Sequence, residues 1–202
     1  MRSATERRFV GGPAGRIECA VDEPASSPRG AALIAHPHPL FGGTLDNKVV
    51  QTLARAFVEL GYEAWRPNFR GIGESEGGYG NGAGEVEDLA AVFHELKSSR
   101  VVLAGFSFGA AMQARLNARL KKENREAERL VLVGVAVATF ETPPVPAGTI
   151  VIHGEHDETV PLAAVLDWAR PQDLPVVLVP GADHFFHRKL QVLRGIVVSN
   201  WK

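Results

Sequence analysis

The segment Val101–Ala111 places a serine between two glycines in a Gly-x-Ser-x-Gly pattern. A serine hydroxyl becomes a nucleophile when a neighbouring base takes its proton. The apolar residues before the pattern predict a strand, and Phe108–Leu120 after it has helical spacing. A sharp turn between the two would strain Ser107 and expose its hydroxyl, while the glycines would let neighbouring backbone approach. The pattern therefore predicts a nucleophile at Ser107, against the alternative of a serine that only caps a helix.

A carboxylate that could orient the base follows in the chain. Asp157 lies just past the apolar run Thr149–Ile152, where a loop can carry it toward the carboxyl edge of a sheet. In strand–turn–helix architectures of this kind the order along the chain is serine, acid, histidine. We therefore favour Asp157 as the acid, with Glu155 and Glu158 as its competitors.

The base is predicted in the loop after the last apolar run, Val176–Val179, where the sequence reads PGADHFFH. His184 stands in this loop and can accept the serine proton if its ring is oriented by the acid. His187 is the weaker candidate because we expect it to begin the final helix. Asp183 is adjacent to His184 and is badly placed to orient its ring.

Hydrolysis through a serine also needs two N–H groups that bind the negative charge developing on the substrate oxygen. The turn after Ser107 supplies one, the N–H of Phe108. The second is expected in the loop after Ala31–Ala35, which reads HPHPLFGG. Its two prolines have no N–H. The donor is therefore His38, Leu40 or Phe41, and we favour Leu40.

Two other site types receive little support. The seven histidines include three short spacings, but none has the helical pattern of a zinc protease. We therefore expect no metal and no other cofactor. The glycines of Gly71–Gly77 do not match a dinucleotide fingerprint, since Glu76 stands where the third glycine belongs. We interpret this segment as a flexible loop over the edge of the sheet.

The elements that would position these residues alternate along the chain. Two short strands flank Gly11–Gly15 and predict an antiparallel hairpin. After the hairpin, short apolar runs alternate with amphipathic segments, which indicates an α/β fold with a mainly parallel sheet. The predicted strands are Ala31–Ala35, Tyr62–Trp65, Val101–Ala104, Leu130–Val137, Thr149–Ile152 and Val176–Val179. The predicted helices are Asn47–Leu60, Glu85–Ser98, Phe108–Leu120, Leu162–Ala169 and Arg188–Ser199.

Composition limits the classes of protein and partner. The 202 residues are 45% apolar and carry a formal net charge of −1, which suits a single folded domain over residues 1–202. The balanced charge favours no nucleic-acid partner. One cysteine, Cys19, excludes an internal disulfide framework. We see no signal peptide and no apolar run long enough for a membrane span, and so expect a cytoplasmic protein without a membrane partner.

Five segments in this order resemble the α/β-hydrolase superfamily over nearly the whole chain. They are His36–Lys48, Asn68–Gly77, the Gly-x-Ser-x-Gly turn, His153–Pro161 and Gly181–Phe186. The chain looks like the small cap-less bacterial serine hydrolases near the dienelactone-hydrolase branch. Dienelactone hydrolases proper use a cysteine nucleophile, so their substrate is not carried over to a chain with Ser107. The resemblance implies a central sheet of about seven or eight strands, helices on both faces, and hydrolysis of carboxylic esters.

In this superfamily a cap usually enters after the strand that follows the serine helix. Here only the proline-rich segment Ala138–Gly148 stands in that place, and it is too short for a helical cap. The sequence therefore predicts a carboxylesterase that cleaves esters or thioesters of small, short-acyl molecules through Ser107, His184 and Asp157. Two alternatives remain open. One is an acyltransferase, perhydrolase or peptidase with the same triad, and the other is a non-catalytic binding protein of this fold.

Overall fold

Eight strands form one sheet in the order β1-β2-β4-β3-β5-β6-β7-β8. The structure is a computed structural model and describes residues 5–201. The strands are β1 (Glu6–Gly12), β2 (Gly15–Asp22), β3 (Gly30–Ala35), β4 (Tyr62–Pro67), β5 (Val101–Phe106), β6 (Arg129–Val133), β7 (Ile150–Gly154) and β8 (Val176–Val179). Strands β3 to β8 pair in parallel, and β1 and β2 form the predicted antiparallel hairpin, with β2 antiparallel to β4. The prediction of a mostly parallel sheet is confirmed.

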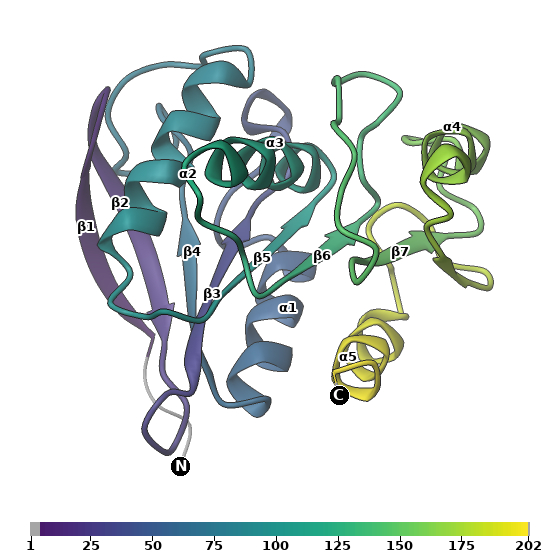
Figure 1. Cartoon of the computed structure of the whole chain (residues 1–202), viewed down its shortest axis with the longest axis horizontal. Coiled ribbons are helices and arrows are strands. Elements are labelled where there is room, and N and C mark those ends of the chain that lie inside the picture. The colour runs from purple at the N-terminus through teal and green to yellow at the C-terminus, as the bar shows by residue number, and fades with distance from the viewer. Residues whose placement is uncertain (1–4, 202) are drawn as a thin grey trace.

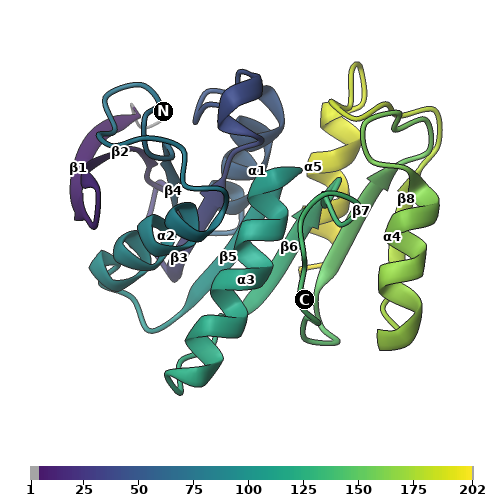
Figure 2. The same cartoon turned by 90° about the horizontal axis from the view of Figure 1, so that it is seen from above.

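Helices cover both faces of this sheet (Figures 1 and 2). Helices α1 (Lys48–Glu59) and α5 (Leu190–Ser199) pack on one face, and α2 (Ala83–Glu95), α3 (Phe108–Lys122) and α4 (Leu162–Ala169) lie on the other. Alternate residues of β5 belong to two separate apolar clusters, with Leu103 on the α3 side and Val102 on the α1 side. Burial on both faces explains why the strands read as unbroken apolar runs.

Two boundaries differ from the predicted ones, one at a glycine that ends a strand and one at a buried carboxylate that begins a helix. The predicted strand Leu130–Val137 ends at Val133, because Gly134 turns the chain with a φ of +52°. Helix α2 begins earlier than predicted, at Ala83. The buried carboxylate of Glu85 accepts hydrogen bonds from the N–H groups of Gly80 (2.8 Å) and Gly82 (2.7 Å) before it.

The segment after β4, residues 68–77, is attached to strand β2. The carboxylate of Glu18 accepts hydrogen bonds from the Asn68 side chain (2.7 Å) and the Glu74 N–H (2.9 Å). The hydroxyl of Ser75 accepts from the Glu18 N–H (2.9 Å) and donates to the Asn68 carbonyl (2.8 Å). Glu18, Asn68 and Ser75 are buried, so these bonds form out of water. The segment predicted as a flexible loop is thus fastened to the hairpin at several points.

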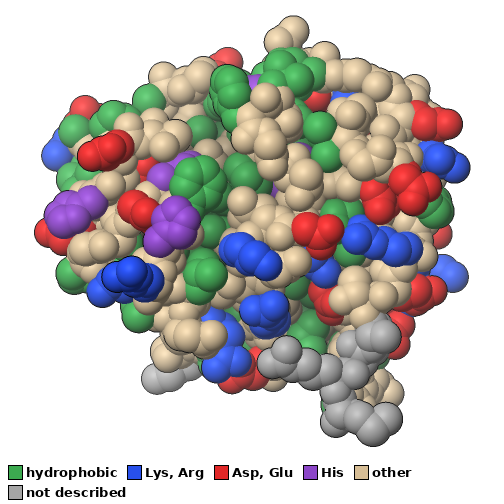
Figure 3. Space-filling model, turned by 180° about the vertical axis from the view of Figure 1, so that it is seen from behind, with side chains coloured by type: hydrophobic (Ala, Val, Ile, Leu, Met, Phe, Trp, Pro, Cys, Tyr) green, Lys and Arg blue, Asp and Glu red, His purple; other side chains and the backbone are tan. Residues whose placement is uncertain are grey.

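Residues 134–149, between β6 and β7, form no helix, so the segment where a cap would insert builds none among residues 5–201. On the face shown in Figure 3, charged side chains of both signs are interspersed, in keeping with a net charge near zero. Within residues 5–201, no helix has the length and apolar character needed to cross a membrane.

Candidate active site

Ser107 occupies a strained turn between β5 and α3. Its φ of 56° and ψ of −118° lie in a region that residues with a side chain rarely adopt. The glycines on either side explain why the turn can be so tight. A Cβ on Gly105 would lie 2.6 Å from backbone atoms at the start of α3, and one on Gly109 would lie 2.4 Å from the carbonyl oxygens of Ala35 and His36. A larger residue at either position would push α3 away from the sheet.

Three predicted site residues meet at the carboxyl edge of the sheet. Nε2 of His184 lies 3.1 Å from Oγ of Ser107, and Nδ1 of His184 lies 2.7 Å from Oδ2 of Asp157. Ser107 follows β5, Asp157 follows β7 and His184 follows β8. The exposed fractions are only 7%, 5% and 7% for Ser107, His184 and Asp157. In this arrangement Nε2 can accept the serine proton while the carboxylate accepts a hydrogen bond from Nδ1.

The Asp157 carboxylate has a fixed orientation. Its Oδ1 accepts hydrogen bonds from the N–H groups of Thr159 (2.9 Å) and Val160 (2.7 Å), which leaves Oδ2 to face His184. The competing carboxylate of Glu155 accepts instead from the N–H of Gly181 (2.8 Å). Glu158 is exposed. Of the three carboxylates that the sequence offered, the structure brings Asp157 to the histidine.

A second histidine, His153, stabilises the turn that carries Asp157. His153 is fully buried on β7, with Nε2 3.0 Å from the Val160 carbonyl and 3.7 Å from Oδ2 of Asp157. Burial lowers the pKa of His153, although the neighbouring Asp157 opposes this shift. A neutral ring donates from Nε2 to the Val160 carbonyl and closes the turn around Asp157. From the sequence, His153 stands out only as part of the segment His153–Pro161 and has no predicted role at the site, since spacing alone does not reveal a buried contact.

In the loop HPHPLFGG, the N–H group left free to bind an oxyanion is not the one that the sequence favours. The chain forms a short 3-10 turn at Pro39–Phe41. The Leu40 N–H donates to Nδ1 of His38 (3.2 Å), and the Phe41 N–H donates to the His38 carbonyl (3.1 Å). Both N–H groups are therefore engaged, and Leu40, the favoured donor, does not offer a free one. Among residues 5–201, neither the His38 N–H nor the Phe108 N–H has an acceptor.

His36 sets the direction of the His38 N–H. Its Nδ1 donates to the Pro37 carbonyl (2.6 Å), and its Nε2 accepts from the Phe69 N–H (3.0 Å). Complete burial lowers the pKa of His36 to about 4, so the ring is neutral at pH 7. In a trans peptide the carbonyl oxygen and the following N–H point in opposite directions. By holding the Pro37 carbonyl, His36 also holds the His38 N–H on the other side of that peptide.

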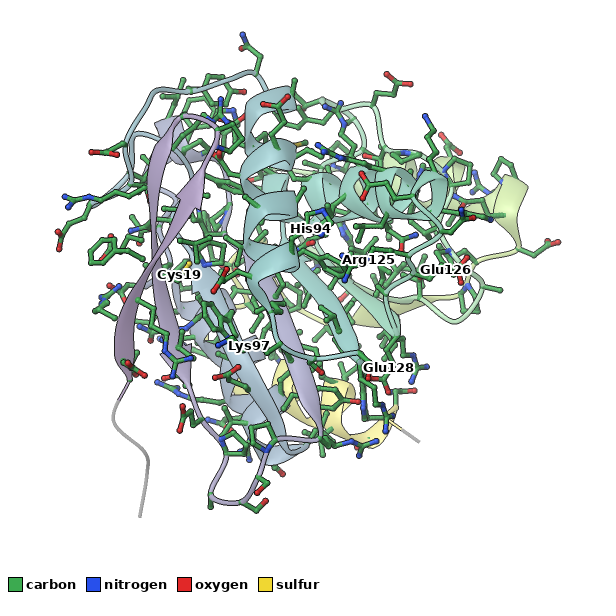
Figure 4. The ribbon with its side chains drawn as sticks, turned by 60° about the vertical axis from the view of Figure 1, so that its left-hand side comes forward. Cys19, His94, Lys97, Arg125, Glu126 and Glu128 are labelled. Carbon is green, nitrogen blue, oxygen red and sulfur yellow. The ribbon has the colours of Figure 1, made fainter. Side chains whose placement is uncertain are left out.

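The remaining metal-ligating and nucleophilic side chains lie elsewhere. In the part of the chain that the structure describes, no three His, Cys, Asp or Glu side chains are grouped to hold a metal ion. Figure 4 shows His94 beside Arg125, with 2.7 Å between His94 Nδ1 and an Arg125 nitrogen, at the end of α2 away from the triad. Cys19 is buried on β2, and burial raises the pKa of its thiol to about 12, so it is no nucleophile.

A cavity of about 840 Å³ lies away from this site. It opens between α1 and the loop that follows β2, and it is lined by arginines and carboxylates, including Arg7, Asp46, Glu59 and Arg66. Many of these charges pair with one another, as Arg66 does with Asp22 (2.9 Å) and Arg194 with Glu59 (2.9 Å). None of the triad residues lines the cavity. Geometry and chemistry therefore select the edge of the sheet as the candidate active site.

Comparison with known proteins agrees with this geometry. A sequence model of the family described as serine aminopeptidase, S33, matches residues 27–148, a region that includes Ser107 and ends before Asp157. An uncharacterized protein from Rickettsia prowazekii is 31% identical over 201 residues, which cover 91% of this chain and 83% of that protein. An α/β serine hydrolase without lid from Xanthomonas campestris is 34% identical, with a TM-score of 0.88, over 99% of this chain and 94% of the other. An α/β serine hydrolase homologue from Coxiella burnetii is 36% identical, with a TM-score of 0.84, over the whole of both chains. The chain therefore belongs to the α/β-hydrolase superfamily, in the family of serine hydrolases that these matches define.

Proposed function

We propose that this serine hydrolase is a carboxylesterase that cleaves esters or thioesters of small molecules with short acyl groups. The observation that carries the proposal is the continuous hydrogen-bonded chain from Ser107 Oγ through His184 to Asp157. A serine hydroxyl that only capped a helix would not need a buried imidazole and a buried carboxylate behind it.

In the proposed reaction Oγ of Ser107 attacks the ester carbonyl carbon while Nε2 of His184 takes the hydroxyl proton. Asp157 stabilises the imidazolium that forms. The N–H groups of Phe108 and His38 bind the oxyanion. When the tetrahedral intermediate collapses, His184 gives its proton to the leaving alcohol or thiol. Water, activated by His184, then attacks the acyl-serine and releases the acid.

The proposed preference for short acyl groups rests on the missing cap. Long acyl chains are bound by apolar surface that encloses them, at about 0.8 kcal/mol for each buried CH₂. Residues 134–149 provide no helix for such an enclosure. The site is therefore open and does not enclose a long acyl chain.

The family model is named for a serine aminopeptidase, and this favours a peptidase as the second candidate. A fluorophosphonate probe should label wild-type protein and leave the Ser107→Ala variant unlabelled. Absence of labelling in the wild type would instead support a non-catalytic binding protein. A panel of p-nitrophenyl esters, acyl-CoA thioesters and aminoacyl p-nitroanilides then separates the reaction classes. We expect turnover of the short esters, and faster turnover of the anilides than of the esters would contradict the proposal.

A further inference from the structure

Tyr79 lies beside the site although it comes from a distant loop. The loop joins β4 to α2, and it brings the Tyr79 hydroxyl to 3.1 Å from Nε2 of His38. The Tyr79 ring centre is 5.0 Å from that of His38 and 6.3 Å from that of Phe108, the residue after the serine. Tyr79 is half-buried, so one part of it remains accessible.

The other hydrogen bond of the His38 ring determines whether His38 or Tyr79 is the donor in their contact. Nδ1 of His38 accepts a hydrogen bond from the Leu40 N–H, so Nδ1 carries no proton. A neutral imidazole then carries its proton on Nε2. Burial lowers the pKa of His38, with a smaller opposing effect from Glu85, and this favours the neutral ring. Nε2–H is therefore the donor, and the oxygen of Tyr79 is the acceptor.

The tyrosine hydroxyl consequently keeps its own proton free for another partner. Within the described residues, the Tyr79 O–H has no acceptor other than His38, and His38 already uses Nε2 as a donor. On its accessible side the O–H can donate to water, and a ligand oxygen can take the place of that water. The arrangement therefore offers an oriented donor to an acceptor that approaches from the open side.

The loop holds this hydroxyl in place before any ligand arrives. The residues that follow Tyr79 are tied by the buried Glu85 carboxylate, which accepts from the N–H groups of Gly80 and Gly82. Apolar rings surround His38 as well, with ring centres 4.6 Å away for Phe41, 4.9 Å for Phe108 and 5.7 Å for Phe140. Phe108 is fully buried behind His38, whereas Phe41 is exposed and Tyr79 and Phe140 are half-buried. This aromatic wall, made of Phe41, Tyr79 and Phe140 beside His38 and backed by Phe108, presents apolar surface and one oriented donor.

From this geometry we infer that the Tyr79 hydroxyl donates a hydrogen bond to an oxygen of the substrate outside the scissile ester group. The favoured substrates then carry an ether, hydroxyl or carbonyl oxygen a few atoms from the reacting carbonyl, on a short, otherwise apolar group. The inference rests on the proposed esterase function. In that function the His38 N–H binds the oxyanion, so the wall around the His38 ring adjoins the reacting carbonyl.

The test uses two pairs of esters that differ only by replacing a CH₂ with an oxygen. On the acyl side the pair is p-nitrophenyl butyrate and p-nitrophenyl methoxyacetate. On the alcohol side it is n-butyl acetate and 2-methoxyethyl acetate. For each pair the ratio of kcat/KM, oxygen ester over alkyl ester, is compared between wild type and Tyr79→Phe. Intrinsic differences in ester reactivity cancel in this comparison.

We expect Tyr79→Phe to lower that ratio about threefold to tenfold in one of the two pairs, the loss typical of one neutral hydrogen bond. The variant keeps the ring but removes the acceptor of His38 Nε2–H. Any general effect of that loss on kcat/KM is shared by both esters of a pair, so the ratio isolates the contact with the additional substrate oxygen. The other tyrosine provides a matched control. Tyr62 is buried and bonds Glu128 (2.9 Å) away from the site, and Tyr62→Phe should leave both ratios unchanged.

Equal ratios in wild type and Tyr79→Phe for both pairs would overturn the inference while leaving the esterase proposal intact. Failure of the esterase proposal has a different signature, because wild-type protein would then hydrolyse none of the four esters, or Ser107→Ala would hydrolyse them equally well. A fall in the ratio with Tyr62→Phe as large as with Tyr79→Phe would also count against a direct contact.

Discussion

Replacing Asp157 by asparagine should abolish nearly all esterase activity without unfolding the protein, because the backbone around Asp157 dictates how the new amide lies. The two N–H groups of Thr159 and Val160 both point at Oδ1. An asparagine satisfies them only if its carbonyl oxygen takes the Oδ1 position. Its NH₂ group must then take the position of Oδ2, 2.7 Å from Nδ1 of His184.

The magnitudes decide which orientation is populated. With the amide reversed, the two backbone N–H groups would lose their acceptor, at a cost of about 1–3 kcal/mol each. With the carbonyl oxygen in the Oδ1 position, the cost falls on His184, whose ring must accept at Nδ1 and carry its proton on Nε2. That tautomer points an N–H at Ser107 and has no lone pair for its proton. The expected loss is about 10⁴-fold in kcat, or about 5 kcal/mol of transition-state stabilisation.

The assay is the steady-state hydrolysis of p-nitrophenyl butyrate near neutral pH, with thermal unfolding as the check on folding. Asp183→Asn is the matched control, since Asp183 is next to His184 in the chain but pairs with His187 (2.6 Å). It should stay within about twofold of wild type, as expected for a surface change. Asp157→Asn activity within tenfold of wild type would refute the reasoning. A large loss in Glu155→Gln or Glu158→Gln would point to a different acid.

Three further predictions concern stability and specificity. Since the folded protein keeps His36 neutral down to about pH 4, whereas an unfolded chain protonates it below about pH 6.5, the free energy of unfolding should fall as pH drops. In urea titrations the His36 share of this fall is about 2 kcal/mol between pH 7 and 5, and His36→Gln should lack it. Gly109→Ala should destabilise the protein by about 1–3 kcal/mol, because its Cβ meets the backbone at the end of β3. Gly195→Ala, also within a helix but in open space, should stabilise it by up to about 1 kcal/mol in the same assay. Measured as kcat/KM from acetate to palmitate, activity should peak at acyl chains of about two to six carbons, and a maximum at twelve or more would contradict an open site.

The strands and helices could be predicted from local sequence patterns, and their observed ranges lie close to the predicted ones. Helix α1 was predicted from its apolar spacing, and Asn47 caps it by accepting from the N–H groups of Val49 and Val50. Gly61 ends it with a φ of +85°, which a glycine adopts easily. The same logic predicts that Ser107, Asp157 and His184 lie together, because the carboxyl ends of parallel strands converge on one edge of the sheet.

The oxyanion donor and the role of Tyr79 could not be predicted from the sequence, because both depend on how the His38 side chain is oriented. Excluding the prolines left three possible oxyanion donors, and the choice among them turns on the His38 ring, which takes up the Leu40 N–H. The spacing of residues along the chain does not predict the rotamer of the His38 side chain. The contact between His38 and Tyr79 spans 41 positions and needs the loop after β4 to close over the sheet edge. The sequence predicts a loop over the edge of the sheet at Gly71–Gly77, but the anchors of this segment on Glu18, and of the residues that follow it on Glu85, are visible only in the folded chain.

The left-handed backbone of Ser107 has a consequence for the evolution of this protein. A residue with a side chain held at a φ of 56° and a ψ of −118° costs on the order of 1–3 kcal/mol, whereas glycine adopts such angles freely. Under selection for heat resistance alone, glycine would therefore be favoured at position 107, and the nucleophile would be lost. Under the proposed function, selection for turnover is what keeps a serine there, so a lineage released from that demand should lose this residue before the strands and helices around it.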